Sequence, residues 1–452
     1  MELERLIAAA TPAEVVNAAA VDVADLAYDA RVARAGTLFF CVPGSRADGH
    51  DHAPAAVAEG AVALVAERPL DLPVPQLIVP SARRAMPPIA ATFFGDPSHE
   101  LEVAGITGTN GKTTTAFLLR SILAAAGRRP GLLTNIERRV GGELRPTGLN
   151  TPEAIDLQRL LREMLDAGDR SCVMEATSIA ASQGRLAGTR FAVLVFTNLT
   201  RDHLDFHGTM EEYFDAKRAL FAQAERAVVN VGDEWGRRLA AELPAARTFG
   251  PDDDLGPVAL RLRGRFNRAN ALAAMEAARA LGVEEDAIRT GIEAVEGVPG
   301  RFESVEEGQP FAVIVDYAHT PDSLQNVLRA ARELGEGRLI VVFGAGGDRD
   351  REKRPLMGEI ARTLSDRAIV TTDNPRSEDA AAIADQVAAG RLEIVLDRRA
   401  AIEAAIEDAG AGDVVVIAGK GADTEQELAG GPIPFDDRVV ARETLRRRAV
   451  PA

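Results

Sequence analysis

One short segment contains the residue types that bind the phosphates of a nucleotide. It reads GTNGKTTT from Gly108 onward. Gly108 and Gly111 allow backbone N–H groups to converge on phosphate oxygens without a Cβ in the way. Lys112 would add a charge for the outer phosphates, and Thr113 would offer its hydroxyl to a magnesium ion. The strict form of the motif fails because Ile106 stands where its first glycine should be, so only the shorter pattern G-x-x-G-K-T fits.

The elements on either side of this segment favour a binding loop over an ordinary turn. An apolar run from Val103 precedes the glycines, and an apolar-periodic stretch that ends at Ala126 follows them. Strand, loop and helix in this order direct the positive end of the helix toward a bound phosphate. The alternative is a glycine-rich turn with an exposed lysine, which would not need these flanking elements. The sequence therefore predicts a phosphate-binding loop.

Two later strands also end in polar residues. Glu175 follows the apolar run CVM, and Asn198, Asp202 and His203 follow the run FAVLVF. In an open parallel sheet, side chains just past the carboxyl ends of the strands line the ligand crevice. Each residue alone could be an ordinary loop residue, and Asp202 could be a helix cap. Because two strand ends share the pattern, we expect these side chains to face the nucleotide and its metal ion.

Three further polar residues of this region have two interpretations. Lys217 lies in the amphipathic segment Glu211–Phe221, where the pattern alone predicts a surface lysine. Asn267 and Asn270 open the helix predicted within residues 260–282. Their amides could face a nucleotide base or could cap the helix. The residues alone do not decide between these roles.

The last third of the chain repeats the pattern of buried strand and polar turn. The apolar runs AVIVD, RLIVVF, AIV and VVVIA are each followed by a turn and a helical segment, which predicts a second doubly wound domain. Arg349, Arg376 and Lys420 fall on these turns. Together they could bind carboxylates, for which the arginine fork is suited. Each one alone could simply solvate the tip of a turn.

Composition excludes several classes of protein. The net charge of the 452 residues is −16, so nucleic acid and anionic membranes are not expected as non-specific partners. Cys41 and Cys172 lie far apart and have no metal-ligand spacing, which is typical of a reducing compartment. No run approaches the roughly twenty apolar residues that span a bilayer, and the first residues, MELERLI, do not resemble a signal peptide. We expect a cytoplasmic enzyme without membrane insertion.

The chain length suits roughly three domains, and all three have α/β patterns. Prolines recur from Pro73 to Pro88 and again at Pro97, and GVPGRFE begins at Gly297. We place boundaries at these points. The expected fold is a small N-terminal α/β domain over 1–98, a central parallel-sheet domain with the phosphate loop over 99–298, and a Rossmann-like domain over 299–452.

Five motifs occur in an order that resembles the Mur ligases, and more narrowly their MurE type. They are GTNGKTTT, TNLTRDHLDFHGT, DYAHTPDSL, FGAGGDRDREKRPLMGEIA and DNPRSE. The resemblance covers nearly the whole chain. It implies, in order, a UDP-substrate-binding domain, an ATP-binding ligase domain and an amino-acid-binding domain. It also implies ATP-dependent amide bond formation through an acyl phosphate, which adds meso-diaminopimelate to UDP-MurNAc-L-Ala-D-Glu in peptidoglycan precursor synthesis. We expect the protein to be a monomer.

The resemblance assigns roles to residues by position. The implied ATP-binding residues are Gly108, Thr109, Asn110, Gly111, Lys112, Thr113, Thr114, Asn267, Asn270, Asp316 and His319. The implied magnesium ligands are Thr113, Glu175, His203 and Lys217. Lys217 matches a lysine that the family carbamylates, and a carbamate is an anionic oxygen ligand rather than a cation. The implied catalytic residues are Lys112, Glu175, His203 and Lys217.

Substrate residues are assigned in the same way. For the UDP-linked acceptor they are Tyr28, Ala30, Ser45, Arg46, Ala47, Asn150, Thr151, Thr177, Gln183 and Arg185. For the incoming amino acid they are Arg349, Asp373, Asn374, Pro375, Arg376, Gly419 and Asp423. The form DNPR resembles members specific for meso-diaminopimelate, in which the arginine pairs with the distal carboxylate that lysine lacks.

Several positions depart from the family pattern. Ala30 replaces a serine, Asn150 replaces a threonine, and Ile179 replaces a histidine. Ala422 and Asp423 replace His-Glu. Because aspartate is one methylene shorter than glutamate, the carboxylate at position 423 lies about 1.5 Å closer to the backbone. That carboxylate is expected to hold the distal ammonium of diaminopimelate, so a water could bridge the gap or the amino acid could differ. The central domain is also short between 230 and 265.

Two alternatives remain open. A paralogue with the same chemistry could ligate a different amino acid or use a different acceptor, as the altered substrate positions suggest. A non-catalytic ATP-binding regulatory protein would need neither the magnesium ligands nor a carbamylated lysine. The joint presence of Lys112, Glu175, His203 and Lys217 argues against that second alternative.

Overall fold

The computed structural model describes residues 1–44 and 47–449 as a mixed α/β protein. The chain packs into two compact units. The first comprises Met1–Thr107, Gly127–Val195 and Ala216–Ala227, and the second comprises Gly108–Ala126, Phe196–Asp215 and Val228–Ala452. Among the described helices, none is long and apolar enough to cross a bilayer. The predicted domain limits at 98/99 and 298/299 remain predictions.

The first unit begins with a five-stranded sheet of order β1-β5-β4-β3-β2. Its strands are β1 (Glu14–Val16), β2 (Asp25–Ala27), β3 (Thr37–Phe40), β4 (Ala61–Ala66) and β5 (Gln76–Ile78). Only β1 runs antiparallel to its neighbour. One face packs against α1 (Leu3–Ala10) and α3 (Ala82–Phe93), and the other packs against α2 (Ala53–Ala58). A proline stands in the first turn of α2, where its missing N–H would have no helical partner.

The first unit also holds strands of the central sheet, in the order β11-β6-β10-β7-β8-β9. These strands are β6 (Glu102–Thr107), β7 (Pro130–Leu133), β8 (Arg138–Val140), β9 (Glu143–Arg145), β10 (Ser171–Glu175) and β11 (Val193–Phe196). The helices of this region are α5 (Ala154–Asp166) and α6 (Ser178–Ser182). Strand β10 is parallel to β6 and to β7, and Glu175 pairs in register with Ile106. The carboxyl ends of β6 and β10 therefore lie at one edge, as predicted.

The second unit contains the helix that follows the glycine loop, α4 (Lys112–Ala125). Gly291 in α11 (Glu285–Glu293) touches the backbone of Ile122 in α4, and Ser121 Oγ donates to the Gly291 carbonyl at 2.6 Å. The other elements of this region are α7 (Leu204–His207), α8 (Met210–Arg218), α9 (Glu234–Glu242), α10 (Arg265–Ala280), β12 (Ala227–Asn230) and β13 (Arg247–Phe249). The close contact with α11 fixes the axis of α4 and therefore the direction of its N-terminus.

The last part of the second unit is a six-stranded sheet of order β14-β15-β19-β16-β17-β18. Its strands are β14 (Glu303–Ser304), β15 (Ala312–Asp316), β16 (Leu339–Phe343), β17 (Arg367–Val370), β18 (Glu393–Ile394) and β19 (Val414–Ala418). All but β14 are parallel. This confirms the four buried strands predicted from the sequence.

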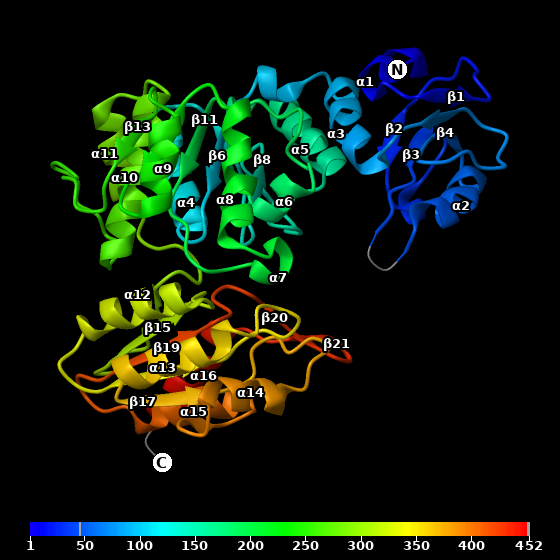
Figure 1. Ribbon diagram of the computed structural model, residues 1–452. Coiled ribbons are helices and arrows are strands. Elements are labelled where there is room, and N and C mark those ends of the chain that lie inside the picture. The colour runs from blue at the N-terminus through cyan, green and yellow to red at the C-terminus, as the bar shows by residue number, and fades with distance from the viewer. Residues whose placement is uncertain (45–46, 450–452) are drawn as a thin grey trace. The chain divides into compact units, whose positions relative to one another are not determined.

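Helices cover both faces of this sheet (Figure 1). One core contains α12 (Pro321–Arg332), α13 (Lys353–Leu364) and α14 (Ala380–Ala388). The opposite core contains α15 (Arg398–Asp408) and α16 (Asp437–Ala449). A separate hairpin, β20 (Glu425–Leu428) with β21 (Gly431–Pro434), follows β19. The C-terminal region is thus doubly wound, as the alternating apolar runs predicted.

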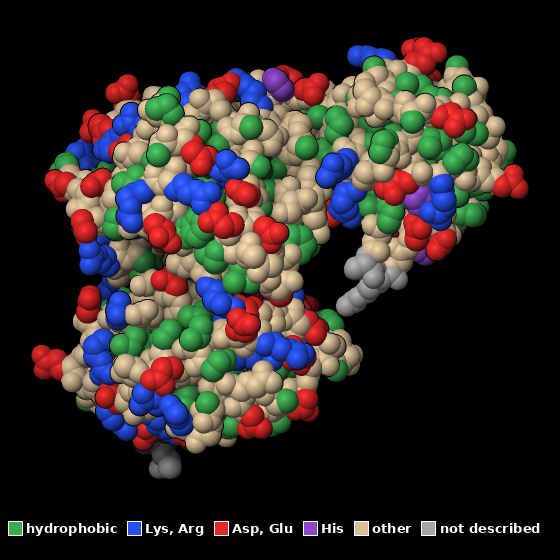
Figure 2. Space-filling view, in the orientation of Figure 1, with side chains coloured by type: hydrophobic (Ala, Val, Ile, Leu, Met, Phe, Trp, Pro, Cys, Tyr) green, Lys and Arg blue, Asp and Glu red, His purple; other side chains and the backbone are tan. Residues whose placement is uncertain are grey.

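Charge is mixed on the surface. Figure 2 shows lysine and arginine side chains interspersed with aspartate and glutamate over the visible face. Ion pairs join many charged side chains of the described residues, such as Arg332 with Asp366 and Arg367 with Glu393. The visible face therefore offers no broad positive surface of the kind that binds nucleic acid.

Candidate active site

Both glycines of the predicted phosphate loop are required by its geometry. Gly108 has φ +144°, and a Cβ there would lie 1.9 Å from Thr197 Oγ1. Gly111 has φ +88°, and a Cβ there would lie 2.2 Å from Asn270 Oδ1. A side chain at either position would therefore meet both backbone strain and a steric clash. The loop leads directly into α4, whose N-terminal N–H groups point toward it.

The segment after β11 holds this loop in place. Thr109 N donates to the Asn198 carbonyl at 2.9 Å, and Asn110 N donates to Asn198 Oδ1 at 2.9 Å. Thr197 Oγ1 donates to the Asn110 carbonyl at 2.7 Å. Thr109 Oγ1 also contacts the carbonyl of Thr200 at 3.1 Å. Asn198, expected to face the nucleotide, therefore uses its amide to position the loop.

Lys112 folds back over the loop that precedes it. Its Nζ donates to the carbonyl of Gly108 at 3.0 Å and to the carbonyl of Thr109 at 2.7 Å. The ammonium group therefore lies at the loop, where an incoming phosphate would compete with these carbonyls for it. Thr114, also predicted to bind ATP, is buried in the first turn of α4.

Arg301 contacts the first turn of the helix after the phosphate loop. It lies in the segment GVPGRFE, which the sequence predicted only as a domain boundary. Its Nη2 donates to Thr113 Oγ1 at 2.9 Å, and its guanidinium lies 4.3 Å from the centre of the Tyr317 ring. Nearby, Asp316 accepts from the N–H of Phe302 at 2.6 Å, and burial raises the pKa of this carboxyl. No sequence pattern predicted a role for Arg301, because 188 residues separate it from Thr113.

The two asparagines of α10 bond to each other. Asn270 Nδ2 donates to Asn267 Oδ1 at 3.0 Å, and Asn267 Nδ2 donates to the Arg263 carbonyl at 2.8 Å. Both side chains are buried, and Asn270 also contacts Gly111. Asn267 therefore fixes the entry to α10, which is close to the capping role considered for it, while Asn270 supports the phosphate loop.

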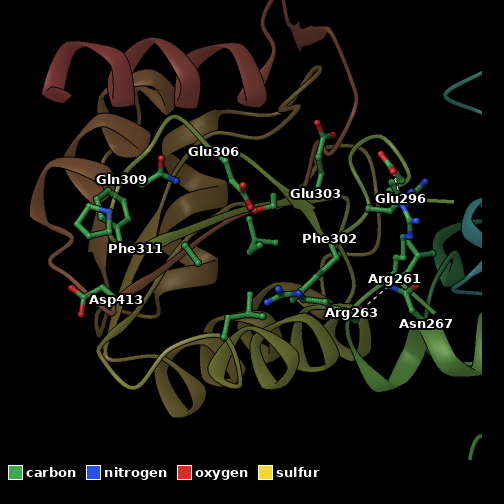
Figure 3. A pocket seen from close by; sticks show the side chains of 18 of the residues that line it. Arg261, Arg263, Asn267, Glu296, Phe302, Glu303, Glu306, Gln309, Phe311 and Asp413 are labelled. Carbon is green, nitrogen blue, oxygen red and sulfur yellow. Dashed lines mark hydrogen bonds and ion pairs between the residues drawn. The ribbon is translucent and has the colours of Figure 1, made fainter. Parts of the chain in front are cut away.

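A pocket of about 680 Å³ adjoins the start of α10. Asn267 and Glu296 lie at one end of it, and Phe311 and Asp413 lie at the other (Figure 3). Arg301 also lines this pocket. Because Arg301 donates to Thr113 as well, one side chain links the pocket to the phosphate loop.

A buried carboxylate gathers three cationic or titratable side chains. Asp202 Oδ2 lies 3.3 Å from His203 Nε2 and 3.7 Å from His319 Nε2. Its Oδ1 lies 3.8 Å from Lys353 Nζ. Burial opposes the charge of Asp202, but the neighbouring side chains of His319, His203 and Lys353 hold the pKa of the carboxyl well below its usual range. The sequence predicted no role for Lys353, although this lysine lies within the motif FGAGGDRDREKRPLMGEIA.

Glu175 and Lys217, both proposed as metal ligands, are each only 1% exposed. The prediction of a surface lysine from the amphipathic pattern is therefore wrong for Lys217. Helix α8 ends one residue later at Arg218, and a 3-10 turn over Ala219–Gln223 replaces the rest of the predicted helix. A buried ammonium is costly, so this position favours a paired or chemically modified lysine.

Several residues assigned to the acceptor meet in the first unit. Thr151 Oγ1 donates to the Glu175 carbonyl at 2.8 Å and lies 3.0 Å from Thr177 Oγ1. Arg185 donates to the Thr151 carbonyl at 3.1 Å and to Gln183 Oε1 at 2.6 Å. Arg185 also pairs with Glu153 at 3.0 Å, a carboxylate that the sequence reasoning missed.

The remaining acceptor candidates have simpler surroundings. Tyr28 donates its hydroxyl to Asp156 at 2.6 Å, and burial together with this carboxylate raises the pKa of the phenol. Ala30 begins a 3-10 turn, and Ala47 and Asn150 are exposed. Ser45 and Arg46 lie outside the described residues. The nearby His50 is a buried structural histidine, which accepts from Glu67 N at 3.0 Å.

The residues assigned to the incoming amino acid lie after β16, β17 and β19. Gly419 has φ +120°, and a Cβ there would lie 2.2 Å from Asp373 Oδ2. Asn374 accepts from Lys420 Nζ at 3.1 Å. Lys420 is fully buried, so it connects the loops and does not solvate a turn tip. Burial raises the pKa of Asp423 to about 6, and the nearby Asp373 adds to the effect.

Arg376 and Arg349 differ in their contacts. Arg376 has φ +53°, and its Nη1 donates to the Gly347 carbonyl at 2.8 Å. Arg349 Nη1 donates to the carbonyl of its neighbour Asp348 at 2.9 Å and is exposed. Pro375 is buried between them, with its carbonyl against Gly347. The turn therefore holds Arg376 more firmly than Arg349.

A buried ion pair stabilises the two loops that follow β17 and β19. Arg398 Nε and Nη2 each donate to the carboxylate of Asp437 at 2.7 Å, and both side chains are fully buried. The guanidinium also donates to the carbonyl of Thr372 at 3.3 Å and to that of Ala418 at 3.0 Å. It thus joins the carboxyl ends of β17 and β19.

Family models match most of the chain. A Mur ligase catalytic domain matches residues 23–92, a Mur ligase middle domain matches 106–254, and a Mur ligase glutamate ligase domain matches 300–421. Curated relatives named UDP-N-acetylmuramoyl-L-alanyl-D-glutamate–2,6-diaminopimelate ligase include one from Halalkalibacterium halodurans. It is 43% identical, with 94% of this chain and 95% of the relative covered. A relative of the same name from Solibacter usitatus is 44% identical, with 95% and 94% covered.

Solved structures agree with these matches. A structure with the same ligase name has a TM-score of 0.65 and 31% identity, covering 95% of this chain and 96% of its own. A MurF ligase from Thermotoga maritima in complex with ADP has a TM-score of 0.64 at 22% identity, covering 94% and 98%, and so supports the fold alone. On this full-length similarity, the chain belongs to the Mur ligase family.

Proposed function

We propose that this protein is an ATP-dependent ligase that adds meso-diaminopimelate to UDP-MurNAc-L-Ala-D-Glu. The observation that carries the proposal is the match to 2,6-diaminopimelate ligases at 43–44% identity over nearly the whole chain. The DNPR turn and the phosphate loop supply the residues that such a reaction needs. We assign acceptor binding to residues 1–98, ATP binding to 99–298 and amino-acid binding to 299–452.

We expect ATP to bind at the phosphate loop, because Gly108 and Gly111 adopt positive φ there and the loop leads into the N-terminus of α4, whose backbone N–H groups suit phosphate oxygens. Lys112 and Arg301 would neutralise the phosphate charge, since both already contact the loop or its first helical turn. We place the nucleoside at the Asn267 end of the pocket, because Arg301 lines that pocket and also reaches Thr113. We assign Asp316, the last residue of β15, and His319, three residues later, to ATP binding as well.

Magnesium would be held by Thr113, Glu175, His203 and a carbamylated Lys217. Among residues 1–44 and 47–449, no group of three or more His, Cys, Asp or Glu side chains is arranged to hold a metal by itself. The donor set therefore fits only if carbamate and phosphate oxygens complete it. Bound there, the ion would neutralise charge on the transferred phosphoryl group.

The reaction proceeds through two transfers. An oxygen of the acceptor carboxylate attacks the γ-phosphorus of ATP, and ADP leaves with the electrons of the broken P–O bond. The amine of the incoming amino acid then attacks the acyl carbon, phosphate leaves, and the nitrogen loses a proton to give the amide. Positioning and charge neutralisation are the main demands of such chemistry. We assign orientation of the acceptor to Arg185 and Thr151, which bond to each other.

The test is ATP turnover with defined substrates. Purified protein is given ATP, magnesium, bicarbonate and UDP-MurNAc-L-Ala-D-Glu, and phosphate release is measured with a panel of amino acids. We expect meso-diaminopimelate to give the fastest release and a tripeptide product by mass spectrometry. Faster turnover with another amine would instead favour the paralogue suggested by Asp423, and no ADP with any amine would reject the ligase.

ATP and UDP-linked precursors are cytoplasmic metabolites in this scheme, so we place the protein in the cytoplasm. We also propose that it acts as a monomer. Light scattering of the purified protein at assay concentration checks this point, and a dimer that alone carries activity would contradict it.

A further inference from the structure

The strand after the amino-acid site brings a second carboxylate to Arg376. Glu427 lies on β20, and its Oε2 accepts from Arg376 Nε at 2.5 Å. Backbone contacts fix this arrangement, because Arg376 N donates to the Glu427 carbonyl at 3.1 Å and Glu427 N donates to Asn374 Oδ1 at 3.0 Å. Glu427 is therefore part of the turn that carries the assigned residues Asn374 and Arg376.

The Arg376–Glu427 pair retains one hydrogen-bond donor and one acceptor that could bind a ligand. Arg376 uses Nε for Glu427 and Nη1 for Gly347, and among the described residues its Nη2 takes no hydrogen-bond partner. The Oε1 of Glu427 likewise takes none among the described residues. The Arg376 side chain is 23% exposed and the Glu427 side chain 51%, so both groups reach solvent. A donor and an acceptor held side by side match a carbon that bears both a carboxylate and an ammonium group.

Asp423 makes no such contact with Arg376. Among the described residues, no hydrogen bond or ion pair joins the Asp423 carboxyl to Arg376, whereas the Glu427 carboxylate pairs with it directly. The backbone N–H of Asp423 donates to the Lys420 carbonyl at 2.9 Å. Glu427 is therefore the carboxylate that lies beside the Arg376 guanidinium.

We propose that Glu427 is a specificity-determining residue, which binds the distal ammonium of the incoming amino acid while Arg376 binds the distal carboxylate. This inference rests on the proposed function for the identity of that amino acid. The Arg376–Glu427 pair selects a zwitterionic end over an end with an amine alone or a carboxylate alone.

The test compares Glu427→Gln with wild type on two substrates. One substrate is meso-diaminopimelate, and the other is 2-aminopimelate, which keeps the distal carboxylate but lacks the distal amine. We expect the KM for diaminopimelate to rise about ten-fold with kcat nearly unchanged, since a charge-assisted contact is lost. The KM for 2-aminopimelate should stay within about two-fold. Glu427→Asp should restore part of the diaminopimelate KM.

The matched control is Glu425→Gln, which removes the same charge from the same strand. Among the described residues, the Glu425 side chain takes no hydrogen bond or ion pair, while its backbone pairs with β21 and its carbonyl accepts from Lys420 Nζ. We expect the control to keep both KM values. If the KM values for both substrates rise by a similar factor in Glu427→Gln, Glu427 only positions Arg376. If both KM values fall, the Glu427 carboxylate competes with the substrate carboxylate for Arg376. Either result overturns the proposal.

Binding measured without turnover separates this inference from the proposed function. Calorimetry with meso-diaminopimelate and each variant compares affinities even if no product forms. A chain that binds diaminopimelate equally well with and without the Glu427 charge would refute the inference, whatever its activity. Loss of affinity in Glu427→Gln together with absent turnover would refute only the ligase assignment.

Discussion

The clearest quantitative prediction concerns Gly108 of the phosphate loop. We expect Gly108→Ala to destabilise the protein and to weaken ATP binding. The backbone has φ +144° at this position, and the added methyl group would lie 1.9 Å from Thr197 Oγ1. That hydroxyl must move, which breaks its 2.7 Å hydrogen bond to the Asn110 carbonyl. The substitution therefore disturbs both the glycine and the segment that holds the loop.

The magnitude follows from two separate costs. An L-residue at positive φ costs about 1 to 2 kcal/mol. The lost hydrogen bond from Thr197 costs about 0.5 to 1.5 kcal/mol. Together we expect the free energy of unfolding to fall by about 1.5 to 3.5 kcal/mol. Because the loop carbonyls also position Lys112, the KM for ATP should rise at least ten-fold.

The matched control is Gly127→Ala. Gly127 also has positive φ, +73°, but a Cβ there would have no atom within 4 Å. The control should lose only the backbone cost of about 1 to 2 kcal/mol and keep its KM for ATP. Urea unfolding gives the stability difference, and phosphate release at varied ATP gives the KM. If Gly108→Ala is no less stable than Gly127→Ala and binds ATP as well, the steric reasoning about the loop is wrong.

Three further predictions address other parts of the site. Asp437→Ala leaves the buried Arg398 charge uncompensated, so the free energy of unfolding should fall by about 3 to 5 kcal/mol. A loss below about 1 kcal/mol in urea unfolding would contradict the stabilising role of this ion pair. Because burial raises the pKa of Asp423 from 3.8 to about 6, its carboxyl binds a proton in the folded state that the unfolded state has released, and stability falls as pH rises from about 4 to 6. Asp423→Asn should therefore be more stable than wild type at pH 7, by up to about 3 kcal/mol, and equally stable near pH 3.5 in the same unfolding assay; a difference independent of pH would count against this. Lys217→Ala should lose turnover, and added short carboxylates should restore part of it in the phosphate-release assay, whereas normal turnover in the variant would remove the carbamate role.

Local patterns were enough to predict much of this protein. The glycine loop, the strand before it and the helix after it depend on residues that are neighbours in the chain. The four parallel strands of the C-terminal sheet were likewise visible as apolar runs, because strands buried on both faces need apolar residues throughout. The family assignment followed from the order of these motifs.

Other contacts depended on tertiary structure. Arg301 reaches Thr113 across 188 residues, and Glu427 reaches Arg376 across 51. Lys217 looked exposed because its helix has an amphipathic pattern, yet it is buried. The sequence alone determined which segments form strands, loops and helices, because those choices depend on nearby residues. Only the tertiary structure decided which side chains meet, because packing brings together residues whose separation in the chain carries no signal of contact.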